Sequence, residues 1–173
     1  IPAGIAGVTT IGCIVMATRS SDRRAAAAIS AYSVTERAFS EYREKVVEQI
    51  GENKERAIRD EIAQDRVTKS PPTEVIITDR GDVLCCELYT GRYFRSEMET
   101  LRKAQNDINH EMISGSPYAT LADFYYIVGL PVTSVSQNVG WDVDRIMELK
   151  FSTVLSDDDK PCLAFEYNYI KPL

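Results

Sequence analysis

Few side chains in this 173-residue chain have types and spacing suited to chemistry. His110 is the only histidine, and it lies off the apolar face of its predicted helix, which indicates a solvent-exposed side chain. No cysteine or carboxylate accompanies it at the spacing of a metal site or of a general base and its partner. We therefore predict no metal, no cofactor and no catalytic residue. A pair of carboxylates brought together only by the fold stays open as an alternative.

Three short patterns resemble functional motifs by their letters alone. Cys85 and Cys86 have no basic neighbour in sequence to lower a thiol pKa, and on a strand they would point to opposite faces. Residues 157–159 are three aspartates without the spaced ligands of a calcium loop, so we expect a solvated hairpin tip. Arg80-Gly81-Asp82 has the composition of a tight turn. We expect none of the three to be a binding site.

Charge is distributed unevenly and excludes one large class of partners. Residues 19–69 carry eleven basic and ten acidic side chains, whereas residues 70–173 carry nine basic and sixteen acidic ones. A surface that binds the phosphate backbone needs a basic footprint, so we predict no nucleic-acid partner. The four cysteines follow no disulfide or Cys-x-x-Cys spacing, which favours reduced thiols and a cytoplasmic location for the acidic part.

Residues 1–18 contain no charged side chain and are rich in small residues. A spanning helix needs about 20 apolar residues, with a range of about 17 to 25, so this segment predicts a short transmembrane helix. Ala3 and Gly7 form a small-xxx-small pair and Gly12 adds a further small position, which favours close helix contacts. Three arginines within residues 19–24 predict that this end faces the cytoplasm. The alternatives are a helix buried against its own copies in an assembly and a signal-peptide remnant.

Residues 19–69 are predicted to form a helical stalk, because they contain no proline and a single glycine, Gly51. Tyr32, Phe39 and Val46 recur every seven residues and form a partial heptad seam. Gly51 is expected to break the stalk into helices over residues 20–50 and 53–67. Because the apolar stripe is too narrow for a monomeric core, we predict self-association through Ala3, Gly7, Gly12, Tyr32, Phe39 and Val46.

A proline hinge at residues 70–73 is predicted to end the stalk and to precede a head domain over residues 74–173. Strands are expected over residues 74–78 and 83–89, joined as a hairpin by the turn at 79–82, and over 92–95. A second hairpin is expected from residues 145–155 and 162–170. In its first strand Met147, Leu149, Phe151 and Leu155 are expected on one side, and Glu148, Lys150 and Ser152 on the other.

Two helices are predicted between these hairpins. Ser96 and Glu99 have the spacing of a capping box for the first helix, which ends near Gly115. Thr120 and Asp123 form a second such box, for a short helix that Gly129 closes. The predicted fold class is therefore α+β: an N-terminal apolar helix, a long helical stalk, and a small domain of an antiparallel sheet with helices.

Several short motifs follow one another along the chain: Thr10-Ile11-Gly12-Cys13-Ile14-Val15, Ala31-Tyr32-Ser33, residues 41–45, residues 91–96, residues 121–126, Gly129-Leu130-Pro131, Gly140-Trp141-Asp142 and Pro161-Cys162-Leu163. In this combination the chain resembles, over almost its whole length, a family of unknown function found in phages and prophages of Gram-positive, often gut-dwelling, bacteria. The resemblance implies a phage origin and an apolar N-terminal part. It brings no catalytic or binding residue with it.

Taken together, the sequence predicts a phage-encoded, non-enzymatic structural or assembly protein that forms homo-oligomers through residues 1–69. We expect it in the virion, or in the bacterial inner membrane with the head in the cytoplasm, where other virion proteins, host membrane proteins or lipid are possible partners. One alternative is a membrane-anchored cytoplasmic effector that binds a host protein. A second is an enzyme with a carboxylate site in the head.

Overall fold

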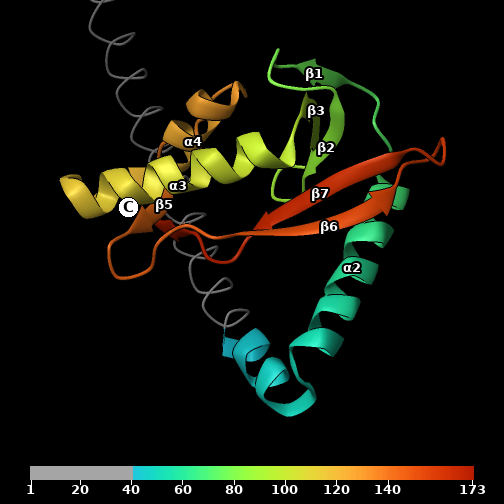
Figure 1. The fold of residues 1–173 in the computed structure, drawn as a ribbon, viewed down its shortest axis with the longest axis horizontal. Helices are drawn as coiled ribbons and strands as arrows, with labels where there is room; N and C mark the ends of the chain where they lie inside the picture. Colours follow the sequence, from blue (N-terminus) through green and yellow to red (C-terminus); the bar gives the residue numbers. More distant parts are fainter. Residues whose placement is uncertain (1–40) are drawn as a thin grey trace, which may run out of the picture.

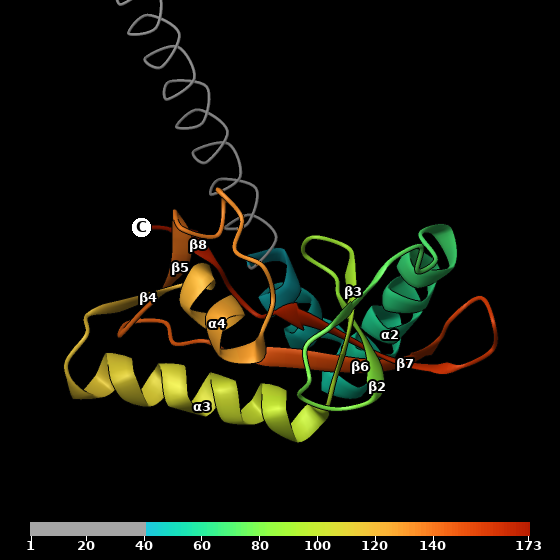
Figure 2. The ribbon, with the colours of Figure 1, turned by 90° about the horizontal axis from the view of Figure 1, so that it is seen from above.

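The computed structural model describes residues 41–173, and this part of the chain has an α+β fold, as predicted (Figure 1). Helices lie on both faces of a five-stranded sheet, and a small three-stranded sheet lies beside α4 (Figure 2). Among the described residues no helix is long and apolar enough to cross a membrane. The predicted apolar helix 1–18 and most of the predicted stalk lie outside the described residues.

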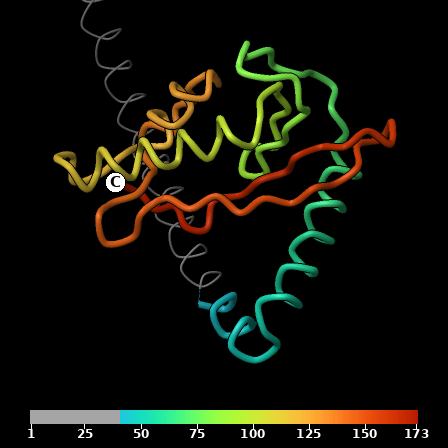
Figure 3. Tube along the Cα trace, viewed as in Figure 1, coloured from blue at the N-terminus to red at the C-terminus, as the bar shows by residue number. Residues whose placement is uncertain are grey.

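Residues 41–50 are helical, and α2 (Glu52–Lys69) follows after a break at Gly51. Gly51 has φ 85° and ψ 156°, a conformation that favours glycine because it has no Cβ. The chain turns there, so the two helices are not collinear (Figure 3). The predicted break is thereby confirmed, with α2 one residue longer at its start and two at its end than expected. α2 ends at Lys69, directly before Ser70 and the two prolines.

The larger sheet is mixed and has the strand order β1-β3-β2-β7-β6. Its strands are β1 (Val75–Ile77), β2 (Val83–Glu87), β3 (Arg92–Ser96), β6 (Leu149–Leu155) and β7 (Pro161–Tyr167). The predicted hairpin of β6 and β7 is present, and β2 and β3 form a second antiparallel pair. The predicted hairpin between residues 74–78 and 83–89 is wrong, because β1 pairs in parallel with β3 instead. β2 and β7 are also parallel, so the prediction of a purely antiparallel sheet is wrong too.

Each face of this sheet has its own apolar cluster, because successive strand residues point to opposite faces. The larger cluster contains Cys85, Phe94 and Phe165 and is covered by α3 (Met98–Ser114) and α4 (Leu121–Val128). The smaller one contains Cys86 and Cys162 and is covered by Ala63 and Val67 of α2. Cys85 and Cys86 therefore do point to opposite faces, as predicted.

The two predicted capping boxes have different outcomes. Thr120 accepts a hydrogen bond from the Asp123 N–H, the Asp123 carboxylate accepts one from the Thr120 N–H, and Gly129 ends α4 in the left-handed conformation. The box at Ser96 is wrong: Ser96 belongs to β3 and is buried, and Glu97 is the N-cap residue of α3. The strand extends one residue further than expected because Ser96 pairs with Val83 of β2.

Leu149, Phe151 and Leu155 of β6 share one side and Ser152 lies on the other, as predicted, but burial does not follow one side. Leu149 is buried as expected, but Leu155 is 48% exposed, whereas Ser152 and Val154 are buried. The reason is that both faces of this strand are covered, by α3 on one side and by α2 on the other, with Ser152 and Val154 on the α2 side.

The smaller sheet is antiparallel and consists of β4 (Tyr118–Thr120), β5 (Val139–Asp142) and β8 (Lys171–Pro172) in the order β4-β5-β8. Trp141 on β5 is fully buried, and its indole N–H donates to the carbonyl of Tyr169 at 2.5 Å. This contact ties the small sheet to the end of the chain that follows β7.

Candidate functional site

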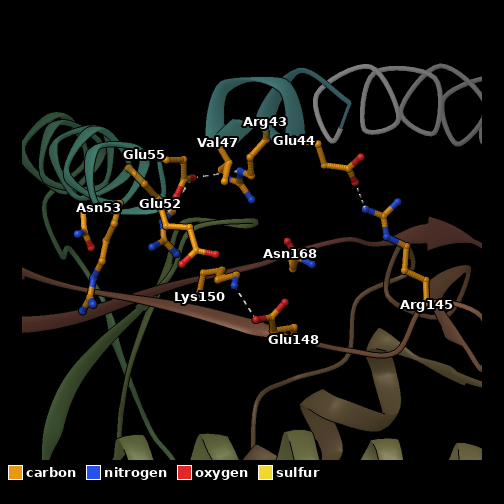
Figure 4. A pocket seen from close by; sticks show the side chains of 12 residues that line it. Arg43, Glu44, Val47, Glu52, Asn53, Glu55, Arg145, Glu148, Lys150 and Asn168 are labelled. Carbon is orange, nitrogen blue, oxygen red and sulfur yellow. Dashed lines mark hydrogen bonds and ion pairs between the residues drawn. The ribbon is translucent and has the colours of Figure 1, made fainter. Parts of the chain in front are cut away.

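A polar cavity lies where helix 41–50 and the start of α2 meet the head. It has a volume of about 390 Å³. The side chains of Arg43, Glu44 and Glu55 enter it from the helices, and Glu148 and Lys150 enter it from the sheet side (Figure 4). We call it the joint cavity, because its walls come from both the helical part and the head.

Ion pairs across the joint cavity hold helix 41–50 against the head. Arg43 is the central residue: its guanidinium lies 2.6 Å from the Glu166 carboxylate of β7 and 3.5 Å from that of Glu55 in α2. The Arg43 side chain is only 17% exposed, so this contact is shielded from water more than a surface pair would be. Glu44 adds a more exposed pair with Arg145 at 3.0 Å. The described end of the predicted stalk is therefore fixed to the head.

A second cavity, of about 430 Å³, runs along β6 between α2 and α3. It shares Arg56, Arg59, Glu148 and Lys150 with the joint cavity, so the two lie next to each other. We call this second cavity the β6 groove. Its far wall is formed by Met98 and Arg102 of α3.

Glu87 is the one fully buried carboxylate of the described residues. Its Oε1 accepts hydrogen bonds from the hydroxyls of Tyr125 and Tyr167, both at 2.6 Å, and its Oε2 accepts one from Thr90. The Arg92 guanidinium lies 3.6 Å from Oε2 and stacks on the Tyr125 ring at 4.4 Å. Burial, reinforced by the negative charge of Glu87, raises the pKa of both tyrosines well above the usual value. Both carboxylate oxygens are engaged, so this cluster acts as a polar connection between β2, β7 and α4.

The three described cysteines are buried and form no disulfide. Burial raises the pKa of Cys86 to about 11 and the pKa of Cys85 and Cys162 to about 12. At neutral pH these thiols are protonated, and a protonated thiol is a poor nucleophile and metal ligand.

The other motifs singled out in the sequence lie apart from the cavities. His110 is exposed, as expected, and its ring is 3.5 Å from the Ser114 hydroxyl. Residues 157–159 form an exposed hairpin tip, where Lys160 pairs with Asp158 and lowers its pKa. No group of three or more metal-binding side chains occurs among residues 41–173.

Of the six residues predicted to mediate self-association, Val46 alone falls within the described residues. It is half-buried on helix 41–50, between Tyr42, which is 67% exposed, and Ile50, which is 37% exposed. Ala3, Gly7, Gly12, Tyr32 and Phe39 lie outside the described part of the chain.

Sequence reasoning missed Glu87, Arg43 and Gln64, whose side-chain amide bonds to the backbone of Leu155 in β6. For Glu87 a signal exists: it is the one charged residue in the apolar run from Val83 to Tyr89, where an inward-facing carboxylate requires partners. Arg43 and Gln64 carry no such signal, because charged and amide side chains are ordinary on a helix surface.

Comparison with protein families shows to which family the chain belongs. The family of unknown function DUF6353 matches residues 1–173, so the protein belongs to this family. No curated protein and no solved structure matches the chain.

Proposed function

We propose that this protein is a phage-encoded, non-enzymatic structural or assembly protein that forms homo-oligomers through residues 1–69. The phage origin, in a Gram-positive and often gut-dwelling host, is supported by the motif resemblance described above. Its proposed place is the virion, or the bacterial inner membrane with the head in the cytoplasm. No nucleic-acid partner is proposed, because residues 70–173 carry an excess of acidic side chains.

The observation that carries the proposal is an uncovered apolar face on helix 41–50. Tyr42, Val46 and Ile50 are spaced four residues apart and share one face of the helix. The neighbouring face, with Arg43 and Val47, lines the joint cavity. The helix thus contacts the head with one side and keeps Tyr42 and Ile50 exposed. A second copy of the same helix is a partner that would cover this face and extend the seam predicted at Tyr32 and Phe39.

The test is the oligomeric state of the full chain in detergent, measured by light scattering coupled to size exclusion. A single oligomer of fixed stoichiometry is expected. Gly7→Leu and Tyr42→Glu should each shift it toward monomer, whereas the control Glu48→Ala, on the opposite face of helix 41–50, should not. A monodisperse monomer of the unaltered chain refutes the proposal. Peptide mass spectrometry of gradient-purified phage particles then tells whether the chain is a stoichiometric virion component.

A second candidate is a membrane-anchored cytoplasmic effector that binds a host protein. It is favoured by the uncharged segment 1–18 and the arginines that follow it. This function predicts the chain in infected-cell membranes, a host protein in cross-linked pull-downs, and absence from virions. Stoichiometric recovery from particles would exclude it.

A further inference from the structure

The outer edge of β6 is partly open. β6 and β7 keep one register from Leu149↔Tyr167 to Leu155↔Pro161. The bonds from the Asn168 N–H to the Glu148 carbonyl and from the Ser156 N–H to the Lys160 carbonyl show that even-numbered residues bond toward β7. Hydrogen-bonded and non-bonded pairs alternate in an antiparallel ladder, so the odd-numbered residues direct their N–H and C=O groups outward.

Two helix side chains close the ends of this edge. The Gln105 amide oxygen of α3 accepts from the Leu149 N–H at 2.8 Å. The Gln64 side chain of α2 both accepts from the Leu155 N–H at 2.8 Å and donates to the Leu155 carbonyl at 2.9 Å. Between these contacts, the outward backbone groups of Phe151 and Thr153 have no hydrogen-bond partner within residues 41–173.

The open stretch forms the floor of the β6 groove, and the two helices limit what fits there. α2 contacts the Ser152 side of the strand, through the bond from the Ser152 hydroxyl to Asp60 at 2.5 Å. α3 contacts the other side, where Arg102 lies 4.9 Å from the ring centre of Phe151. A whole sheet edge from a second copy would bring its own two helices against these walls. A single extended segment is narrow enough to lie between them.

The groove has an excess of positive charge in a protein of net charge −6. Its lining includes the four cations Arg56, Arg59, Arg102 and Lys150, against the two carboxylates of Asp60 and Glu148. Glu148 is already paired with Lys150 at 2.5 Å, and Asp60 accepts the Ser152 hydroxyl.

The two arginines at the mouth of the groove carry this excess. Arg56 is exposed and forms no ion pair within the described residues. Arg102 has the Phe151 ring as its contact. Carboxylates are the groups that these side chains would bind with paired hydrogen bonds.

We propose that the β6 groove binds an extended acidic peptide segment of a partner protein by β-strand addition. The backbone of the segment pairs with the N–H and C=O groups of Phe151 and Thr153. Its carboxylates contact Arg56 and Arg102. The main-chain hydrogen bonds supply affinity, and the charges select the sequence. The inference concerns the head and goes beyond the proposed self-association through residues 1–69.

The experiment is selection of random octapeptides displayed on a carrier against the full chain in detergent, followed by anisotropy titration of the enriched peptides. Acidic sequences without proline at their centre are expected.

Thr153→Pro removes one outward N–H, and it tests the backbone pairing because proline is tolerated at an open strand edge. It should weaken binding at least tenfold, whereas the control Thr153→Val, which keeps the N–H, should bind like the unaltered chain. Binding by Arg56→Glu/Arg102→Glu should fall by a similar factor.

Amide hydrogen exchange provides a readout that does not depend on any variant. Binding of an enriched peptide should slow exchange at Phe151 and Thr153 and leave the distant helix α4 unchanged. Three results would overturn the proposal. The first is no enrichment of any peptide, and the second is that enriched peptides bind the folded Thr153→Pro variant as tightly as the Thr153→Val control. The third is tighter binding of a dT8 oligonucleotide than of the peptides, if the two charge reversals abolish that binding and Thr153→Pro does not change it.

Discussion

The side-chain amide of Gln64 pairs with the backbone of Leu155 in the way that a neighbouring strand would. It donates to the Leu155 carbonyl and accepts from the Leu155 N–H, across 91 positions of sequence. The helix α2 thereby closes the end of edge strand β6 in addition to covering one face of the sheet.

Replacing this amide should destabilise the head. Gln64→Leu removes the two hydrogen bonds to Leu155, each of which contributes about 0.5–1.5 kcal/mol net, and an exposed one to the Thr68 hydroxyl. We expect the free energy of unfolding to fall by about 1–3 kcal/mol in urea titrations followed by circular dichroism. Glu61→Gln, at an exposed position of the same helix, should change it by less than about 0.5 kcal/mol. Equal stability of Gln64→Leu and the unaltered chain would contradict the structural role of the pair.

The Glu87 cluster should be among the most sensitive positions. Glu87→Ala leaves the hydroxyls of Tyr125 and Tyr167 without their common acceptor and Arg92 without its carboxylate, which should cost about 3–5 kcal/mol. Tyr125→Phe removes one hydrogen bond to a charged group and should cost about 1.5–3 kcal/mol. Tyr126→Phe is the matched control, because Tyr126 is the next residue but its side chain is 79% exposed. Losing its hydroxyl should leave the stability nearly unchanged. Thermal and urea unfolding of the three variants measures the difference.

The buried thiols predict an alkaline limit to stability. Cys85, Cys86 and Cys162 have folded-state pKa values of about 12, 11 and 12 against 9.0 for an unburied thiol. Above pH 9 the unfolded chain therefore releases protons that the folded chain retains, so stability falls as pH rises from 9 toward 11–12.

Two measurements check this prediction. The ionisation of these thiols should not change the urea midpoint of unfolding below pH 9. Above pH 9 it should lower the midpoint as the pH rises. At pH 8, iodoacetamide followed by peptide mass spectrometry should leave the three cysteines unmodified until urea unfolds the chain. Rapid native labelling of Cys85, Cys86 or Cys162 at pH 8 would show that burial does not protect them.

Gly140 and Gly115 form a matched pair for a steric test. A Cβ on Gly140 would lie 2.0 Å from the Ala119 carbonyl oxygen and 2.8 Å from the Thr120 Cα, both backbone atoms of the neighbouring strand β4. Gly140→Ala should therefore separate β4 from β5 and destabilise the fold by several kcal/mol. Gly115 has no atom within 4 Å of such a Cβ and an extended φ of 177°, so Gly115→Ala should be nearly neutral. Comparable unfolding curves for the two variants would refute the close approach.

The sequence was informative where the signal is local. The break at Gly51, the capping box at Thr120 and Asp123, and the hairpin of β6 and β7 all depend on residues close together in the chain. Pairing between distant strands was not predictable in the same way. The turn at residues 79–82 suggests a hairpin, but a turn does not determine which edge the following strand occupies, and β3 separates β1 from β2.

The candidate sites likewise depend on contacts between distant residues, which the sequence does not predict. The joint cavity depends on Arg43 meeting Glu166, 123 positions away, and no periodic pattern relates such residues. The alternation along β6 predicted correctly which residues share a side, but it did not predict that both sides are buried. A strand that is covered by helices on both faces buries odd-numbered and even-numbered residues alike, so the alternation of apolar and polar residues no longer tells which face is buried.

The strand order has a consequence for biosynthesis. The inner position between β2 and β6 is occupied by β7, residues 161–167, and β2 itself comes almost eighty residues earlier. Parallel pairing over such a separation requires a large loop to close before the contact forms, which slows folding. During translation the larger apolar cluster thus stays incomplete until Leu163 and Phe165 have left the ribosome. Residues 1–69 emerge well before that point, so the self-association proposed for them would begin while the rest of the chain is still unfolded.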